Sequence, residues 1–218
     1  YYNFVTNQID TLKSGLIFFN GLGDTLYSRW YGENNRFIVR GFERLDNNLF
    51  LMGTTKIIVD GTKSYIVKTD LQGNMIWEKM LTQYTTDYNN VIDIAKIGNE
   101  GYLLTGIHNS NINGNNAGLY RIDSSGNILW HKNLYSNAND GCYNIREDAD
   151  GTYFLSGDID TIVNATDFPH TGFISKIDSS GNFIWMHLFN EIPHIRKGMW
   201  QHRLLNNGDI IISGYRYE

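Results

Sequence analysis

The sequence has little cysteine, proline or basic charge, and each shortage excludes a class of protein. Its one cysteine, Cys142, cannot form a disulfide within the chain. Charged residues make up 19% of the chain, the formal net charge is -5, and the Lys and Arg residues are scattered singly. This pattern excludes the basic face of a nucleic-acid-binding protein. No run reaches the roughly 18 consecutive apolar residues of a membrane helix.

The chain also lacks an initiator methionine, since it begins with Tyr1, and it carries no signal peptide. We therefore expect a processed chain or a piece of a longer one, and the missing leader says nothing about export. Glycine, with 22 residues, and aromatic residues, at 14%, are plentiful by contrast. Glycine permits tight turns, and large rings fill the space between stacked sheets. The composition favours a chain of short hairpins.

One motif occurs three times, in residues 64–77, 118–130 and 172–185. It consists of an apolar run, Asp-x-x-Gly-Asn, a second apolar run and a Trp, and the tryptophans are 53 and 55 residues apart. A degenerate copy lies earlier, with Asn20, Gly23 and Tyr27 in the Asp, Gly and Trp places. An Asp that accepts hydrogen bonds from the turn amides, followed by a Gly, predicts a β-hairpin. We expect a structural role for Asp70, Gly73, Trp77, Asp123, Gly126, Trp130, Asp178, Gly181 and Trp185.

A second motif, an apolar strand closed by Gly, has the same period. Its four closing glycines, Gly53, Gly106, Gly157 and Gly214, are 53, 51 and 57 residues apart. Two independent motifs with one period of about 54 residues indicate a repeat architecture of about four strands per repeat. The sequence predicts an all-β protein, a β-propeller of four-stranded antiparallel blades with about four repeats in a single domain, 1–218. The repeat units are about 14–55, 64–108, 117–159 and 172–216.

The first strand of each blade is expected at residues 37–45, 91–97, 142–146 and 199–205. The last two contain polar or charged residues such as Arg146 and His202. Polar character is typical of an innermost strand that lines a wet channel.

The third copy, with its Phe-x-x-Lys-Ile-Asp-x-x-Gly-Asn-x-x-Trp pattern at residues 173–185, resembles the bacterial β-propeller repeat family abbreviated SBBP. The repeat is also similar to the tryptophan-docking repeats of quinoprotein dehydrogenases and of outer-membrane assembly lipoproteins. The resemblance covers residues 14 to 216 and implies that Trp77, Trp130 and Trp185 lock adjacent blades. The Asn- and Tyr-rich, Pro-poor style resembles that of secreted Bacteroidota proteins. We therefore expect an extracellular, cell-surface or outer-membrane-associated location.

Four repeats are fewer than the roughly six to eight blades implied by the resemblance. Two interpretations stay open. The chain is part of a longer propeller, or residues 15–31 supply the two outer strands of the last blade and close a ring of four.

Residues with catalytic or metal-binding potential show no recognisable spacing. The six histidines form no zinc motif, and no nucleophile elbow, phosphate loop or dinucleotide fingerprint occurs. Asp148 and Asp150 could hold calcium, but the sequence lacks the remainder of an EF-hand loop. We predict no catalytic residue, no metal and no cofactor.

Long loops rich in Tyr, Trp, Asn and His are the candidate binding surface, because aromatic area with adaptable amides suits protein or glycan partners. The candidate binding residues are Tyr84, Tyr88, His108, Asn111, His170, His194 and Trp200. The first hypothesis is a non-catalytic binding or scaffold propeller that mediates protein–protein contacts in an exported, cell-surface or envelope complex. The second is a glycan-binding or glycan-hydrolysing propeller, and the third, suggested only by the tryptophan repeat, is a quinone-dependent dehydrogenase.

Overall fold

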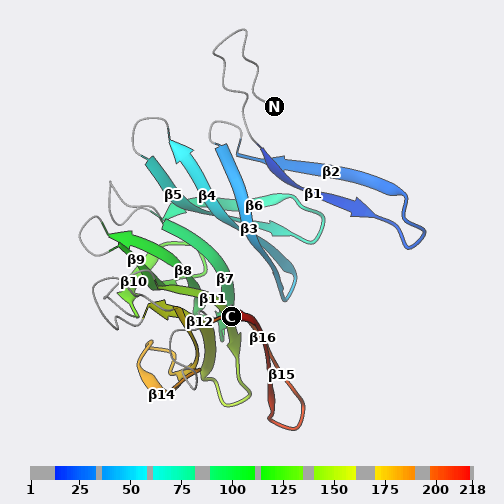
Figure 1. Cartoon of the computed structure of the whole chain (residues 1–218). Helices are drawn as coiled ribbons and strands as arrows, with labels where there is room; N and C mark the ends of the chain where they lie inside the picture. Colours follow the sequence, from blue (N-terminus) through cyan, green and yellow to red (C-terminus); the bar gives the residue numbers. More distant parts are fainter. Residues whose placement is uncertain are drawn as a thin grey trace.

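The chain forms a row of small antiparallel sheets. The computed structural model describes residues 13–32, 36–57, 61–81, 89–110, 114–134, 140–160, 170–189 and 197–216. The regular structure in these ranges is β-strand throughout, as predicted, with no helix. None of the described segments is therefore a helix long and apolar enough to cross a membrane. Three four-stranded sheets lie between two two-stranded sheets, and Figure 1 shows the five following one another along an arc.

Each complete sheet consists of four consecutive strands. The first sheet contains β3 (Arg36–Leu45), β4 (Asn48–Ile57), β5 (Gly61–Asp70) and β6 (Met75–Leu81). The second contains β7 (Asn89–Ile97), β8 (Gly101–Ser110), β9 (Gly114–Ile122) and β10 (Ile128–Asn133). The third contains β11 (Gly141–Glu147), β12 (Tyr153–Asp160), β13 (His170–Ile177) and β14 (Phe183–Leu188).

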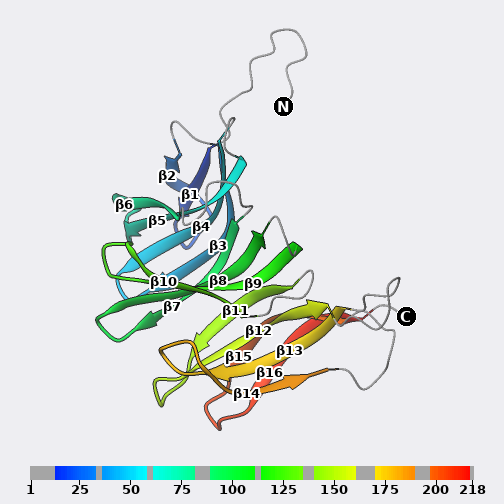
Figure 2. The ribbon, with the colours of Figure 1, turned by 90° about the vertical axis from the view of Figure 1, so that its left-hand side faces the viewer.

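The two ends of the arc are half-sheets. One contains β1 (Ser14–Phe19) and β2 (Thr25–Tyr31), and the other contains β15 (Lys197–Leu204) and β16 (Ile210–Arg216). By the repeat, β1 and β2 are the third and fourth strands of a sheet, and β15 and β16 are the first and second. Among the described residues no ladder joins β16 to β1, so the ring of four that the sequence allowed is not closed. Figures 1 and 2 both place the half-sheets at opposite ends of the row.

The predicted hairpin turns are confirmed. Asp70 Oδ1 accepts hydrogen bonds from the amides of Gln72 (2.9 Å) and Asn74 (2.8 Å), and Gly73 has a φ of 76°. The same bonds recur at Asp123 and Asp178. The side-chain amide of the Asn that ends each turn (Asn74, Asn127 and Asn182) donates a further hydrogen bond to the same carboxyl group. Together these bonds lower the pKa of all three carboxyl groups, because they stabilise the charged form.

The closing glycines lie opposite a β-bulge in the first strand of their sheet. In the second sheet Gly106 pairs with Val91, and the register shifts before Asp93. A Cβ atom at residue 106 would overlap the carbonyl oxygen of Asn90. Gly53, Gly157 and Gly214 meet the same obstacle, so the glycine of this motif is a packing requirement of the bulge.

Neighbouring sheets pack face to face through apolar clusters. The first strand of each later sheet lies against strands one to three of the sheet before it, as β7 does on β3, β4 and β5. The fourth strand carries the docking tryptophan. Trp77 on β6 donates its indole N–H to the carbonyl of Ser124 (3.2 Å) in the next sheet's turn. Trp130 on β10 reaches the corresponding turn of the third sheet at Gly181.

Candidate functional site

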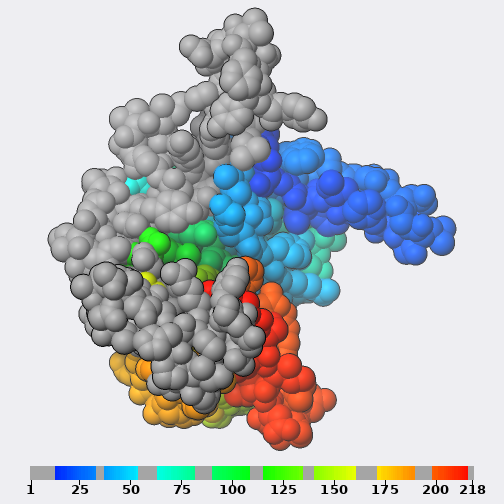
Figure 3. Space-filling model, in the orientation of Figure 1, coloured from blue at the N-terminus to red at the C-terminus, as the bar shows by residue number. Residues whose placement is uncertain are grey.

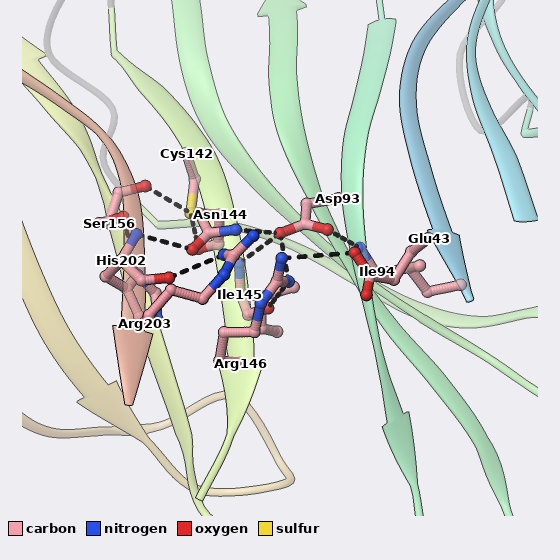
Figure 4. Close-up of polar contacts among 10 residues, drawn as sticks. All are labelled: Glu43, Asp93, Ile94, Cys142, Asn144, Ile145, Arg146, Ser156, His202 and Arg203. Atoms are coloured by element: carbon pink, nitrogen blue, oxygen red, sulfur yellow. Dashed lines mark hydrogen bonds and ion pairs between the residues drawn. The ribbon is translucent and has the colours of Figure 1, made fainter. Parts of the chain in front are cut away.

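Buried polar side chains form a network across the first strands of three sheets (Figure 4). Asp93 on β7 is its centre, and its Oδ2 accepts hydrogen bonds from Asn144 Nδ2 (2.5 Å), the amide of Ile145 (2.9 Å) and the guanidinium of Arg146 (2.8 Å). Arg146 also reaches Glu43 on β3 at 3.3 Å. One carboxylate thus fastens the second sheet to the third, and Arg146 links the third sheet to the first.

The network continues into the last half-sheet. Asn144 Oδ1 accepts the amide of His202 on β15 at 2.9 Å, and His202 Nδ1 lies 2.9 Å from Ser156 Oγ. Burial, together with the charges of the nearby cations Arg146 and Arg203, lowers the pKa of His202 to about 3. Burial likewise raises the pKa of Asp93, against the opposing effect of Arg146. His202 is therefore neutral at physiological pH.

These contacts repeat from sheet to sheet. Asp93 and Asn144 directly follow the bulge in their strands, and each accepts the amide of a residue in the next first strand. Gln201 holds the same place on β15 and is exposed. Asp93, Asn144 and Gln201 each stand 13 residues before their closing glycine. This constant offset is a sequence signal for the set, and it lies outside the two repeat motifs.

The network joins one sheet to the next. We expected polar first strands to line a wet channel, but Asp93, Asn144 and His202 are buried between sheets. Their hydrogen bonds run to other residues of the chain, and the Asp93 carboxylate forms an ion pair with Arg146. Among the described ranges, no group of three or more His, Cys, Asp or Glu side chains could hold a metal ion.

A second buried cluster contains three carboxyl groups at the ends of β11 and β12. Asp140 accepts the amide of Asp160 at 2.9 Å, and Tyr143 donates its hydroxyl to Asp158 at 2.8 Å. Burial, together with the charges of Asp160 and Asp158, raises the pKa of Asp140 to about 7. Asp140 can therefore carry a proton near neutral pH, which reduces repulsion inside the cluster.

The Asp148 and Asp150 pair is occupied by a lysine. Lys176 Nζ lies 2.7 Å from Asp148 Oδ2 and 2.9 Å from Asp150 Oδ2. A hydrogen bond from Thr152 and the contact with Lys176 lower the pKa of Asp150 to about 2. In this structure the two carboxylates pin a turn to β13, which is a structural role.

Four of the seven predicted binding residues lie outside the described residues, and a fifth is described only in its backbone. Tyr84, Tyr88, Asn111 and His194 lie outside the described residues, and of His170 only the backbone, at the start of β13, is described.

His108 and Trp200 are placed, and both lie in strands rather than in the loops where we expected them. His108 is buried on β8, with Nδ1 at 3.1 Å from Asn133 Oδ1, so it is not part of an exposed surface. Trp200 is exposed at the bulge of β15, with its ring centre 6.0 Å from that of Tyr215 and 6.3 Å from that of Tyr143.

Several side chains of the last half-sheet and of β14 are exposed. We use the name end face for Trp185, His187, Trp200 and Ile211, which are exposed, and Tyr215, which is half-buried. Trp200 and Tyr215, with Ser213 and Gly214, line a cavity of about 580 Å³. In Figure 3 the blue β1–β2 hairpin and, below it, the red β15–β16 hairpin project on the right-hand side of the view.

No protein-family model matches the chain, and no curated protein matches it either.

Proposed function

We propose that the chain is a non-catalytic, protein-binding β-propeller module of an exported, cell-surface or envelope-associated complex, and that its end face is the contact surface. The arc of four-stranded sheets with tryptophan-docked turns supports the propeller assignment. The SBBP-like resemblance rests on the repeat motif of the sequence alone. The proposal for location rests on the sequence style alone.

The observation that carries the binding role is an apolar surface left uncovered. Ile211 lies three residues before the closing glycine of its half-sheet and is 58% exposed. Phe154 lies three residues before the closing glycine of the third sheet, and it is only 7% exposed because the next sheet covers it. Phe50 and Leu103 hold the same place in their sheets and are fully buried. Exposed positions that the repeat otherwise buries mark a surface suited to a protein partner.

A binding assay with matched charge substitutions tests this role. Immobilised wild-type chain should retain a protein partner from an envelope extract of the source cells, and Ile211→Asp should lose it. Leu129→Asp, which alters an equally exposed residue on the outer strand β10, should retain it. Equal retention by the wild-type chain and the Ile211→Asp variant would contradict the end face as the binding surface.

Glycan binding is a second candidate, because the cavity beside Trp200 and Tyr215 offers aromatic faces to a sugar ring. A glycan array probed with the wild-type chain and with Trp200→Ala tests it. Signals that do not depend on Trp200, or no signals, would remove this candidate.

A further inference from the structure

We propose that the end face docks the β1–β2 hairpin of a second copy of this chain, so that β15, β16, β1 and β2 form one composite four-stranded sheet. This inference rests on the proposed function and names the partner of the same surface. Its basis is that each end of the arc lacks what the other end presents.

The first match is between an uncovered turn and an uncovered tryptophan. In complete sheets the preceding sheet covers the turn glycine. A Cβ atom added to Gly126 would lie 3.1 Å from the Trp77 ring, and a Cβ atom added to Gly181 would lie 2.9 Å from the Trp130 ring. Gly23, in the β1–β2 turn, has a similar φ of 90°, yet nothing lies within 4 Å of its Cβ position.

Trp185 is the docking residue without a turn. It holds on β14 the place of Trp77 on β6 and Trp130 on β10, but it is 41% exposed because the described residues place no third and fourth strands beside β16. Seating it on Gly23 of a second copy would reproduce the two existing Trp–Gly contacts.

The residue two places after each tryptophan supports the same pairing. Lys79 Nζ lies 3.3 Å from Asn127 Oδ1, and Lys132 Nζ lies 3.2 Å from Asn182 Oδ1, each in the next sheet's turn. On β14 this place is taken by His187, and in the β1–β2 turn the Asn place is taken by Asp24. A docked hairpin therefore sets an acidic acceptor against a basic side chain.

The first strands show the same deficit. β7, β11 and β15 each pack on strands one to three of the preceding sheet, whereas β3 has only the third-strand equivalent, β1. Phe42 on β3 is 51% exposed, although Ile94, Ile145 and His202 at the same place are buried. β15 and β16 of another copy would supply the two missing strands, and Gln201 would then face β3.

A second copy fits better than closure within one chain. Both half-sheets are described, and they stand unpaired at opposite ends of the arc (Figures 1 and 2). The buried bonds from Asp93 and Asn144 fix how successive sheets pack, so closing the chain on itself would require several sheet interfaces to change. Two copies that exchange β1–β2 satisfy both ends and alter none.

Cysteine cross-linking tests the pairing on the full chain. In the first sheet Gly53 pairs with Tyr65, which lies five residues before the turn residue Asp70. In the half-sheets Gly214 corresponds to Gly53, and Asn20 corresponds to Asp70. The same register therefore places Gly214 opposite Gly15 and Ile212 opposite Ile17. Single variants Ile17→Cys and Ile212→Cys are mixed and equilibrated in a thiol–disulfide redox buffer, in which cysteines held side by side form a stable disulfide. An added cross-linker would not reach a docked pair, because Leu51 and Val67 at the corresponding places in the first sheet are buried. Cys142 is fully buried, so it should not react, and the wild-type chain is the control.

We expect the mixture, but neither variant alone, to give a product of twice the 25.0 kDa chain mass. Adding Trp185→Ala should lower the yield roughly tenfold. Ile184→Ala should leave the yield unchanged. Ile76 and Leu129 hold the same place in complete sheets and are equally exposed there, so docking is not expected to cover Ile184.

Two results would overturn the inference. One is cross-linking only within a single Ile17→Cys, Ile212→Cys double variant, which would mean that the chain closes on itself. The other is no cross-link together with a monomer mass by native mass spectrometry. If the retention assay meanwhile captures a different protein on the wild-type chain but not on the Ile211→Asp variant, the proposed function stands, and only the inference of a second copy as partner is wrong. If no partner of any kind is retained, both fail.

Discussion

Gly106 illustrates how strongly a single residue constrains each sheet. The bulge brings the carbonyl oxygen of Asn90 close to the α-carbon of Gly106, so a side chain at residue 106 would have to displace the first strand. We expect Gly106→Ala to lower the free energy of unfolding by roughly 1–3 kcal/mol, the usual effect of overpacking. Gly21→Ala is the control, since nothing lies within 4 Å of its Cβ position. Equal urea midpoints for the two variants would refute the packing role.

His202 gives the network a pH dependence of defined sign. Its pKa is about 6.5 when unfolded and about 3 when folded, so between these values the unfolded chain binds more protons. Stability is therefore lost as the pH falls below about 6.5, by at most about 1.4 kcal/mol per pH unit for this group. Asp140, whose folded pKa is about 7, acts in the opposite sense.

Urea unfolding of wild type and His202→Gln between pH 7 and pH 5 separates the two groups. The wild-type chain should lose more stability on acidification than the variant, because Asp140 is common to both. A variant with the same pH slope as wild type would show that His202 is not buried in its neutral form.

At the scale of elements, the docked tryptophans hold one sheet to the next. Trp130 reaches Gly181 of the third sheet, while its neighbour Leu129 points to solvent. We expect Trp130→Ala to reduce the free energy of unfolding by roughly 2–4 kcal/mol and Leu129→Ala by less than about 0.5 kcal/mol. Thermal unfolding of both variants checks this. Similar losses would argue against docking.

The sequence predicted these elements well where the physics is local. Asp70, Asp123 and Asp178 bond to amides within four residues, so their turns can be read from the motif alone. The strand order follows from the repeat for the same reason. The first strands were located correctly, but their polar residues were given the wrong environment.

The Asp93 network could not be predicted because its partners come from other sheets. Asp93 and Asn144 are 51 residues apart, and their contact depends on how two sheets stack. The sequence pattern shows that both residues are polar, but it does not show which face of a first strand the next sheet covers. His108 was expected in a loop because the apolar run ends at Ile107, but the ladders on both edges of β8 continue to His108, which is buried.

At the scale of the whole molecule, one interface is repeated along the arc and is left incomplete at both ends. This one fact has three consequences: no turn covers Trp185, no tryptophan covers Gly23, and no preceding sheet covers Phe42. The end face and the β1–β2 hairpin are therefore the parts of the molecule whose surroundings should change on assembly.

Hydrogen exchange measured by mass spectrometry at low and high protein concentration tests this account most directly. We predict slow exchange in β4, β8 and β12 at both concentrations, because they are the second strands of complete sheets and are hydrogen-bonded on both edges. Amides of β16 and β1 should exchange rapidly in dilute solution and become protected at high concentration. Rapid exchange in β8 and β12, or β16 amides that stay unprotected at every concentration, would contradict it.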